Sequence, residues 1–173
     1  RSPPILETAQ QTRDNTKLPV SFCYADFTKL PKRMHGQFDM VACLANAISG
    51  VGSVANLRQS IKNFHAVLAP GGTLVLQMLN YAAIKEDTLM PIKATENNGI
   101  VYERFSERQG KSLFIYVTRA DFRAKPPKFE VFRHQFDNFS PEQVERAVRN
   151  AGFEQVQMYA DLYVKKRFGV RSR

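Results

Sequence analysis

The sequence is poor in the features that mark several classes of protein. It has no Trp and only two Cys in 173 residues. Two cysteines make no disulfide framework, and Cys23 and Cys43 both lie in apolar runs, so we expect buried, reduced thiols and a cytoplasmic protein. No apolar run approaches the ~20 residues that cross a bilayer, and no signal peptide pattern opens the chain. We therefore expect no membrane partner.

The sequence also lacks the spacing of metal ligands and a surface for stacking bases. Its three His and two Cys are scattered, which predicts no metal site. The formal net charge is +9, but residues 165–173 supply five of these charges and contain no acid. We interpret this segment as a solvated tail or as a contact for phosphates or an anionic surface. Nucleic acid is a possible partner only through this tail.

The composition that remains is globular. Hydrophobic residues make up 43% of the chain and charged residues 24%, which excludes wholesale disorder and fibrous repeats. Ile5, Leu6 and Ala9 stand at helical spacing at the start. Short apolar runs at residues 20–24 and 40–44 then predict two strands.

A second helix and a third strand are predicted next. Leu57, Ile61, Phe64 and Leu68 mark one helical face, and Ser53 is a plausible N-cap. Pro70-Gly71-Gly72 ends this helix, and residues 73–78, which are apolar except for Thr73 and Gln77, predict a strand. Apolar strands separated by amphipathic helices indicate βαβ units and a parallel sheet with helices on its faces.

The second half has the pattern of an antiparallel meander. Residues 100–107 and 112–120 flank Gln109-Gly110, which predicts a hairpin, and residues 129–136 alternate like a half-exposed strand. Ser140, Pro141 and Gln143 predict a capped helix start. That helix has a buried stripe and ends at Gly152, and residues 153–162 predict a closing strand. The stripe consists of Val144, Ala147, Val148 and Ala151.

Together these elements predict one α/β domain with a Rossmann-like, mostly parallel sheet and an antiparallel addition. We place an α/β core at residues 1–90, the meander at 98–138, the final helix and strand at 139–164 and the basic tail at 165–173.

Five segments occur in a characteristic order. They are SPPILETA at residues 2–9, FCYADF at 22–27, FDMVACLANA at 38–47, LAPGGTLVL at 68–76 and SPEQVERAVRNAGF at 140–153. In this order they resemble the class I S-adenosylmethionine-dependent methyltransferases, of the type that acts on small molecules. The resemblance implies S-adenosyl-L-methionine as the cofactor and a small-molecule methyl acceptor.

The resemblance also implies where the cofactor binds. The adenine would lie against Ala25, Asp26 and Phe27, because its amino group needs an acceptor and its ring nitrogen a donor, and Phe27 offers an apolar surface. Taken alone, Asp26 is better explained as a solvated carboxylate at a strand end or as a helix N-cap for a turn through Thr28. A second cofactor contact would come from the carboxyl end of a parallel strand, which carries Leu44, Ala45 and Asn46.

For the substrate, Asn80-Tyr81 resembles the Asn-Tyr pair of small-molecule methyltransferases similar to glycine N-methyltransferase. Those that bind a glycine carboxylate have Arg before this pair, whereas this chain has Leu79, which speaks against glycine. The meander would cover the pocket, with side chains that are otherwise explained as solvent-facing. These are Tyr102, Arg104 and His134. The resemblance singles out no catalytic residue.

The family's Gly-rich turn and its ribose-binding acid have no counterpart. Gly50-Val51-Gly52 has the glycine spacing but follows a later strand, and we interpret it as a flexible loop. We therefore expect the chain to be the C-terminal portion of a longer protein, without the family's first two strands. The sheet edge that this leaves open would allow self-association.

Two other functions stay open at this stage. The preserved pattern without the cofactor glycines also fits a degenerate methyltransferase-like interaction module. An RNA methyltransferase with a basic tail is the third hypothesis, although the chain has no Asn/Asp-Pro-Pro-Tyr-like tetrapeptide and no catalytic Cys motif.

Overall fold

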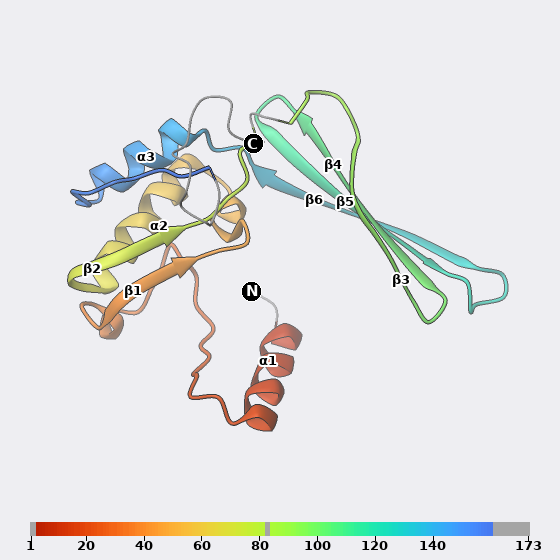
Figure 1. The fold of residues 1–173 in the computed structure, drawn as a ribbon, viewed down its shortest axis with the longest axis horizontal. Coiled ribbons are helices and arrows are strands. Elements are labelled where there is room, and N and C mark those ends of the chain that lie inside the picture. Colours follow the sequence, from red (N-terminus) through yellow and green to blue (C-terminus); the bar gives the residue numbers. More distant parts are fainter. Residues whose placement is uncertain (1–2, 82–83, 161–173) are drawn as a thin grey trace.

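The computed structural model describes residues 3–81 and 84–160, which form an α/β body and a projecting antiparallel sheet that we call the arm (Figure 1). The elements of the body are α1 (Pro3–Thr16), η1 (Lys32–Met34), β1 (Phe38–Cys43), η2 (Ala47–Gly50), α2 (Val54–Val67), β2 (Leu68–Leu76) and α3 (Pro141–Asn150). The arm consists of β3 (Met90–Asn97), β4 (Ile100–Gln109), β5 (Ser112–Asp121) and β6 (Lys128–Asp137).

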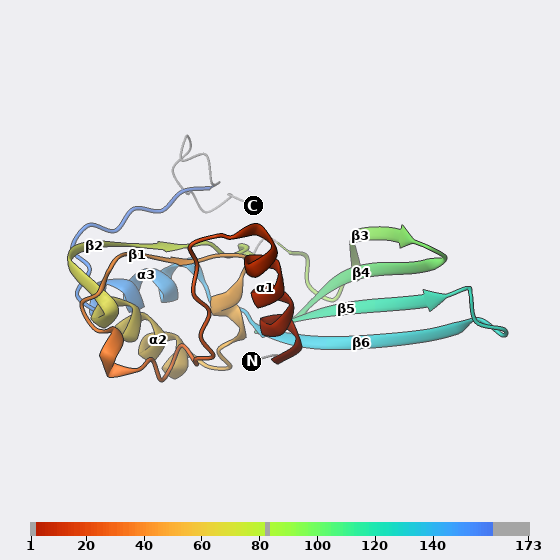
Figure 2. The same cartoon turned by 90° about the horizontal axis from the view of Figure 1, so that it is seen from below.

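The body is built on one parallel strand pair. β1 and β2 are hydrogen-bonded in parallel, and α2 and α3 lie together on one face of the pair (Figure 2). The side chains between the strands and these helices form the core, and each fully buried aliphatic group contributes ~1.5–3 kcal/mol. The buried core residues are Cys43, Ile48, Leu57, Ile61, Phe64, Phe139, Val144 and Ala147.

The predicted helix signals are confirmed. Ser53 caps α2 by accepting a hydrogen bond from the Asn56 amide at 3.1 Å. Ser140 and Gln143 form a reciprocal capping box at the start of α3. Leu57, Ile61 and Phe64 are buried on α2, so the predicted apolar stripe faces the core.

The meander is also confirmed, with one strand more than predicted. β4 and β5 pair over ten residues each without a register shift, and the turn between them contains Gly110 at a φ of 55°. β3 was not predicted, because all eight of its residues are exposed and Pro91, Lys93 and Glu96 interrupt any apolar alternation. The sheet order is β3-β4-β5-β6.

Two predicted strands differ from the structure. Residues 20–24 form no strand, because no other described segment pairs with their backbone, and Cys23 is exposed rather than buried. Residues 153–160 form no strand apart from a single bridge position at Tyr159, while residues 161–162 of that predicted strand, and the basic tail, lie outside the described residues.

Two boundaries differ as well. The strand predicted from residue 73 begins earlier, at Leu68. Leu68 is therefore the C-cap of α2 and the first residue of β2, and not the last apolar residue of the helical face as predicted. The resulting extra residues are absorbed by a register shift, because Phe38 pairs with Leu68 but Met40 pairs with Thr73. The first predicted helix forms as α1, although its described side chains are exposed or half-buried and Ile5 is 71% exposed.

Candidate functional site

The most unusual backbone in the body lies directly after β1. Ala45 and Asn46 both have left-handed backbone conformations, with φ values of 54° and 61°. This conformation costs a residue with a Cβ atom about 1–2 kcal/mol, and such strain concentrates at functional sites. The strained turn therefore marks the carboxyl end of β1, where the sequence predicts a cofactor contact.

Hydrogen bonds from the end of β2 hold this turn in place. The Gln77 side chain accepts from the Ala45 amide at 2.6 Å, and the Gln77 amide donates to the Cys43 carbonyl at 2.9 Å. The Asn46 amide donates to the Gln77 carbonyl at 3.3 Å, and Asn46 Oδ1 accepts from the Leu79 amide at 2.6 Å. The side chains of Gln77 and Asn46 thus join the end of β1 to the segment that follows β2.

The predicted substrate pair, Asn80-Tyr81, is separated from the end of β2 by three residues. Tyr81 is buried, with 2% of its surface exposed, and its hydroxyl interacts with Ser49 of η2. Burial raises the pKa of Tyr81, and the nearby Ser49 side chain opposes that rise only in part. The structure therefore brings Asn80-Tyr81 beside the segment that follows Asn46, with a phenol that stays neutral at physiological pH.

The predicted adenine contact adopts a compact turn. Asp26 Oδ1 accepts from the Thr28 amide at 2.8 Å and from the Thr28 hydroxyl at 2.7 Å, which is the turn-cap geometry. Phe27 stacks edge-on against Phe64 with ring centroids 5.2 Å apart, and its carbonyl accepts from Asn63 Nδ2 at 2.7 Å. Ala25, Asp26 and Phe27 are all half-buried.

The two predicted cofactor segments lie toward different ends of α2. Asn46 opens η2, which leads into the start of α2 at Val54. The turn at Asp26 is held instead by Asn63, nine residues further along, or ~14 Å at 1.5 Å per residue. Residues 25–27 and residues 44–46 are therefore held in place by different contacts.

Tyr102, Arg104 and His134 lie on the arm, away from the strand ends. All three side chains lie on one face of the sheet. Arg104 is aligned through Val117 with Phe132, and Tyr102 and His134 lie two residues from Arg104 and Phe132 on their own strands. His134 stacks on Phe136 with centroids 4.6 Å apart. Tyr102 hydrogen-bonds with Arg119, so its hydroxyl has a structural partner.

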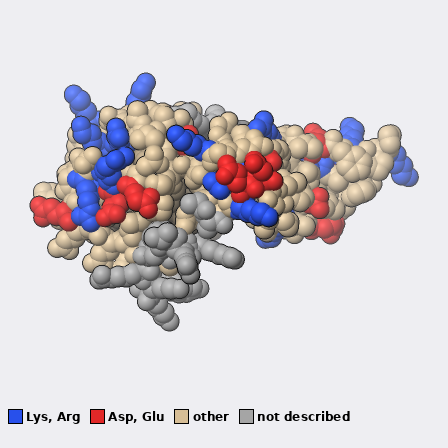
Figure 3. Space-filling view, turned by 90° about the horizontal axis from the view of Figure 1, so that it is seen from above, with Lys and Arg blue, Asp and Glu red and all other residues tan. Residues whose placement is uncertain are grey.

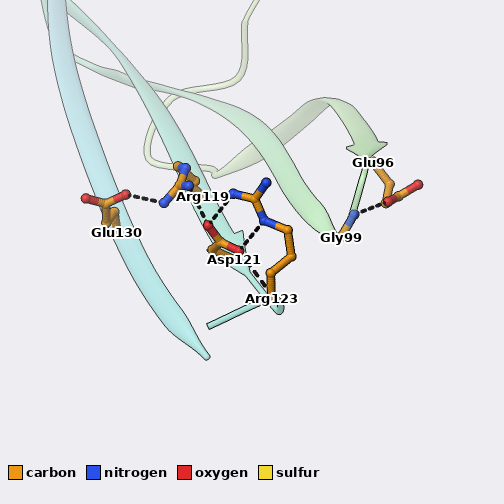
Figure 4. A network of polar contacts seen from close by, with 6 residues as sticks. All are labelled: Glu96, Gly99, Arg119, Asp121, Arg123 and Glu130. Atoms are coloured by element: carbon orange, nitrogen blue, oxygen red, sulfur yellow. Dashed lines mark hydrogen bonds and ion pairs between the residues drawn. The ribbon is translucent and has the colours of Figure 1, made fainter. Parts of the chain in front are cut away.

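That partner belongs to an ion network near the tip of the arm (Figure 4). Asp121 binds Arg119 at 2.7 Å and Arg123 at 2.8 Å, and Arg119 also binds Glu130 at 2.8 Å. The hydrogen bonds from Arg123 are the main reason that the pKa of the Asp121 carboxyl lies well below its usual range. The same network raises the pKa of Arg119, led by its hydrogen bond with Tyr102.

A groove of about 1350 Å³ runs along β2, between the strand and residues 152–160, with α3 as one wall. Of the predicted site residues only Asn80 lines it, but Gln77 and Leu79, which hold the strained turn, also belong to its lining, so the groove adjoins the supports of that turn. Within residues 3–81 and 84–160 no cluster of His, Cys, Asp or Glu has the arrangement of a metal site. The described helices include none with the length and apolarity to span a bilayer. Basic and acidic side chains are interspersed over the face shown in Figure 3.

Two residues of the site were not predicted. Gln77 is a polar residue at the end of an otherwise apolar run, and this position is the feature of the sequence that could have indicated its role in holding the turn. Ser49, which is fully buried, had no such signal, because its contact with Tyr81 depends on how η2 packs.

The known proteins that this chain resembles are methyltransferases. Residues 1–76 match the family described as "Methyltransferase domain". The chain is 26% identical over 140 residues to a glycine/sarcosine/dimethylglycine N-methyltransferase of Actinopolyspora halophila, covering 79% of this chain and 23% of the relative. It is 31% identical over 85 residues to a glycine/sarcosine N-methyltransferase of Parasynechococcus marenigrum, covering 49% of this chain and 30% of the relative. The chain therefore spans less than a third of the length of these two relatives.

Solved structures show the same fold. An S-adenosylmethionine-dependent methyltransferase from Clostridium acetobutylicum superposes with a TM-score of 0.79 at 14% identity, covering 99% of this chain and 68% of the other. The methyltransferase CcbJ from Streptomyces caelestis gives 0.78 at 20% identity with the same coverage. The predicted fold is thereby confirmed: this chain has the Rossmann-like fold that these S-adenosylmethionine-dependent methyltransferases share.

Proposed function

We propose that this chain forms part of an S-adenosylmethionine-dependent methyltransferase that acts on a small molecule. The observation that carries the proposal is the strained turn at Ala45 and Asn46, held by Gln77 at the carboxyl end of β1. Open α/β sheets bind their ligands at this position. The family match and the curated relatives, which are N-methyltransferases, support the same assignment.

The residues at this turn suit the cofactor. Leu44 and Ala45 are exposed although they follow a buried strand end, and the small Ala45 side chain lets a ligand approach the backbone. We assign Leu44, Ala45 and Asn46 to the methionine side of S-adenosyl-L-methionine. Ala25, Asp26 and Phe27 would hold the adenine, with Asp26 as acceptor for its amino group.

We further propose that the described elements act as one methyltransferase domain. Residues 1–90 supply the α/β core, the meander at 98–138 with β3 as its outer strand covers the acceptor, and residues 139–164 complete the body. The Gly52–Asp137 hydrogen bond of 2.6 Å, which joins the core to the arm, supports this division.

When bound, the cofactor supplies an electrophilic methyl group with a good thioether leaving group. The protein then has to hold the acceptor atom in line with that methyl and exclude water. Asn80 and Tyr81 are the proposed acceptor contacts from the body, and the phenol of Tyr81, which is buried and neutral, adds no charge to the site. A general base is needed only for an acceptor that is protonated at working pH.

The arm would supply the remaining acceptor contacts. Tyr102, Arg104 and His134 share one face of the sheet, which is the observation that supports this assignment. The small-molecule class is supported by relatives named for glycine and sarcosine and by a structural neighbour described as an amino pentose methyltransferase. Leu79, in place of Arg before the Asn-Tyr pair, favours an acceptor other than glycine.

Calorimetric titration with S-adenosylhomocysteine tests the cofactor assignment. We expect saturable binding that Asn46→Ala weakens at least tenfold, since this variant removes the bond to the Leu79 amide and the residue best suited to the left-handed turn. Gln11→Ala, an amide on exposed α1, is the matched control and should bind like the parent. Equal binding by both variants would remove the strained turn from the cofactor site.

A further inference from the structure

β6 is an edge strand with apolar side chains in solvent. Among the described strands it is the outermost of the arm and pairs with β5 only (Figure 2). Its first eight residues are all exposed. Phe129, Val131 and Phe132 are 70%, 68% and 55% exposed, so apolar groups project from both faces of this strand.

No strand within residues 3–81 and 84–160 pairs with the outer side of the β6 backbone. The Asn138 amide donates to the Lys111 carbonyl at 3.2 Å, one step beyond the pair of Ser112 and Asp137. Bonded pairs alternate along an antiparallel ladder. The even-numbered residues of β6 therefore bond to β5, and Phe129, Val131, Arg133 and Gln135 direct their N–H and C=O groups outward.

The opposite edge of the sheet is protected against pairing, whereas β6 is not. β3 contains Pro91, and its register shifts between Pro91 and Lys93. Proline and irregular register are the devices by which proteins block edge-to-edge association. β6 has neither: it pairs with β5 over ten residues without a shift and contains no proline.

We propose that β6 pairs antiparallel with β6 of a second copy of this chain, which joins two arms into one continuous sheet. A strand related to itself by a two-fold axis satisfies the outward N–H and C=O groups of both copies at once. The pairing also brings the exposed apolar side chains of the two strands together. This inference does not depend on the proposed enzymatic function.

Charge selects among the registers that pair most of β6, whose axes lie near the middle of the strand. Centring the two-fold axis on Glu130 or on Arg133 would place like charges directly opposite each other, which is destabilising. Centring it on Val131 would place Lys128 opposite His134, two basic groups. Centring it on Phe132 places Glu130 opposite His134 and the two Phe132 rings face to face, so we assign this register.

Substitution by proline at the outer edge tests the interface. Val131→Pro removes an N–H that the arm itself does not use, a position where edge strands tolerate proline. Ala94→Pro is the matched control, because the same alternation directs the Ala94 N–H outward from β3. By sedimentation velocity of the full chain we expect a concentration-dependent dimer for the parent and for Ala94→Pro, and a monomer for Val131→Pro.

Disulfide trapping tests the register independently of that variant. In a Cys23→Ser background, Phe132→Cys places two thiols across the axis in a non-bonded pair, where Cα atoms lie ~4.5 Å apart, within disulfide range. Phe129→Cys is the control, because its counterpart lies six residues away, or ~20 Å. We expect an oxidised dimer from Phe132→Cys alone.

Three results would overturn the proposal. One is a parent chain that stays monomeric at all concentrations, which would leave the exposed face of β6 for a different partner. The second is a dimer that survives Val131→Pro with unchanged affinity. The third is equal cross-linking of Phe129→Cys and Phe132→Cys, which would rule out the assigned register.

Discussion

The Gly52 amide donates a hydrogen bond to Asp137 Oδ2 at 2.6 Å and thereby joins two parts of the chain that are 85 residues apart. Gly52 lies between η2 and α2, and Asp137 is the last residue of β6. Gly52 has a φ of 89°, which a residue with a side chain rarely adopts. The arm is therefore fixed to the body close to the segment that holds the proposed site.

We expect Asp137→Asn to loosen the base of the arm. The variant exchanges a charge-assisted hydrogen bond for a neutral one, which is worth ~1 kcal/mol. Chemical denaturation should show a loss of that order, and hydrogen exchange should accelerate in β6 and η2. Asp14→Asn, whose carboxylate lies on exposed α1, is the control and should leave exchange in the arm unchanged.

The strained turn predicts opposite effects from two neighbouring substitutions. Ala45→Gly relieves a left-handed backbone and should raise the free energy of unfolding by ~1 kcal/mol. Asn46→Ala should lower it by ~1–2 kcal/mol, because it loses the bond to the Leu79 amide and keeps the strain. Urea denaturation of both variants checks this, and destabilisation by Ala45→Gly would show that the turn is not strained.

Local sequence signals predicted the elements that are stabilised within themselves or by a sequence neighbour. Ser53 and Ser140 cap their helices as predicted, and Gly110 forms the hairpin turn, because each acts within a few residues. The strand predicted at 20–24 does not form, since strand formation depends on a pairing partner that the local pattern does not reveal. β3 shows the converse, because pairing with β4 makes a strand of a segment without apolar alternation.

The sequence likewise predicted the location of the candidate site but not its backbone conformation. The end of β1 was identified from the apolar run that precedes Leu44 and from the family resemblance. The left-handed turn was not, because Ala45 has no sequence preference for that conformation, and Gln77 imposes it from 32 residues away. The contact between Tyr81 and Ser49 likewise arises only when η2 packs into the core.

The two cysteines should differ sharply in reactivity. Cys23 is exposed and Cys43 is buried, and burial raises the pKa of the Cys43 thiol despite a backbone hydrogen bond with Ile48 that opposes the rise. At pH 8 we expect a thiol reagent to modify Cys23 alone, because the neutral thiol of Cys43 is both inaccessible and unreactive. In denaturant both should react. Mass spectrometry after timed labelling makes the measurement, and Cys23→Ser, which should show no native labelling, is the control.

The ion network of the arm predicts a dependence on pH in the acid range. The folded-state pKa of Asp121 lies below the usual value of 3.8, so its contribution to stability is present above that value and is lost as pH falls through the folded pKa. We expect hydrogen exchange in β4 and β5, corrected for its intrinsic pH dependence, to show constant protection between pH 7 and about pH 5 and falling protection below pH 4. Asp121→Asn should reduce protection already at pH 7, because Arg119 and Arg123 lose their shared carboxylate. Asp87→Asn, on the loop before β3, serves as the matched control, and an equal effect of both variants would show that the network does not stabilise the arm.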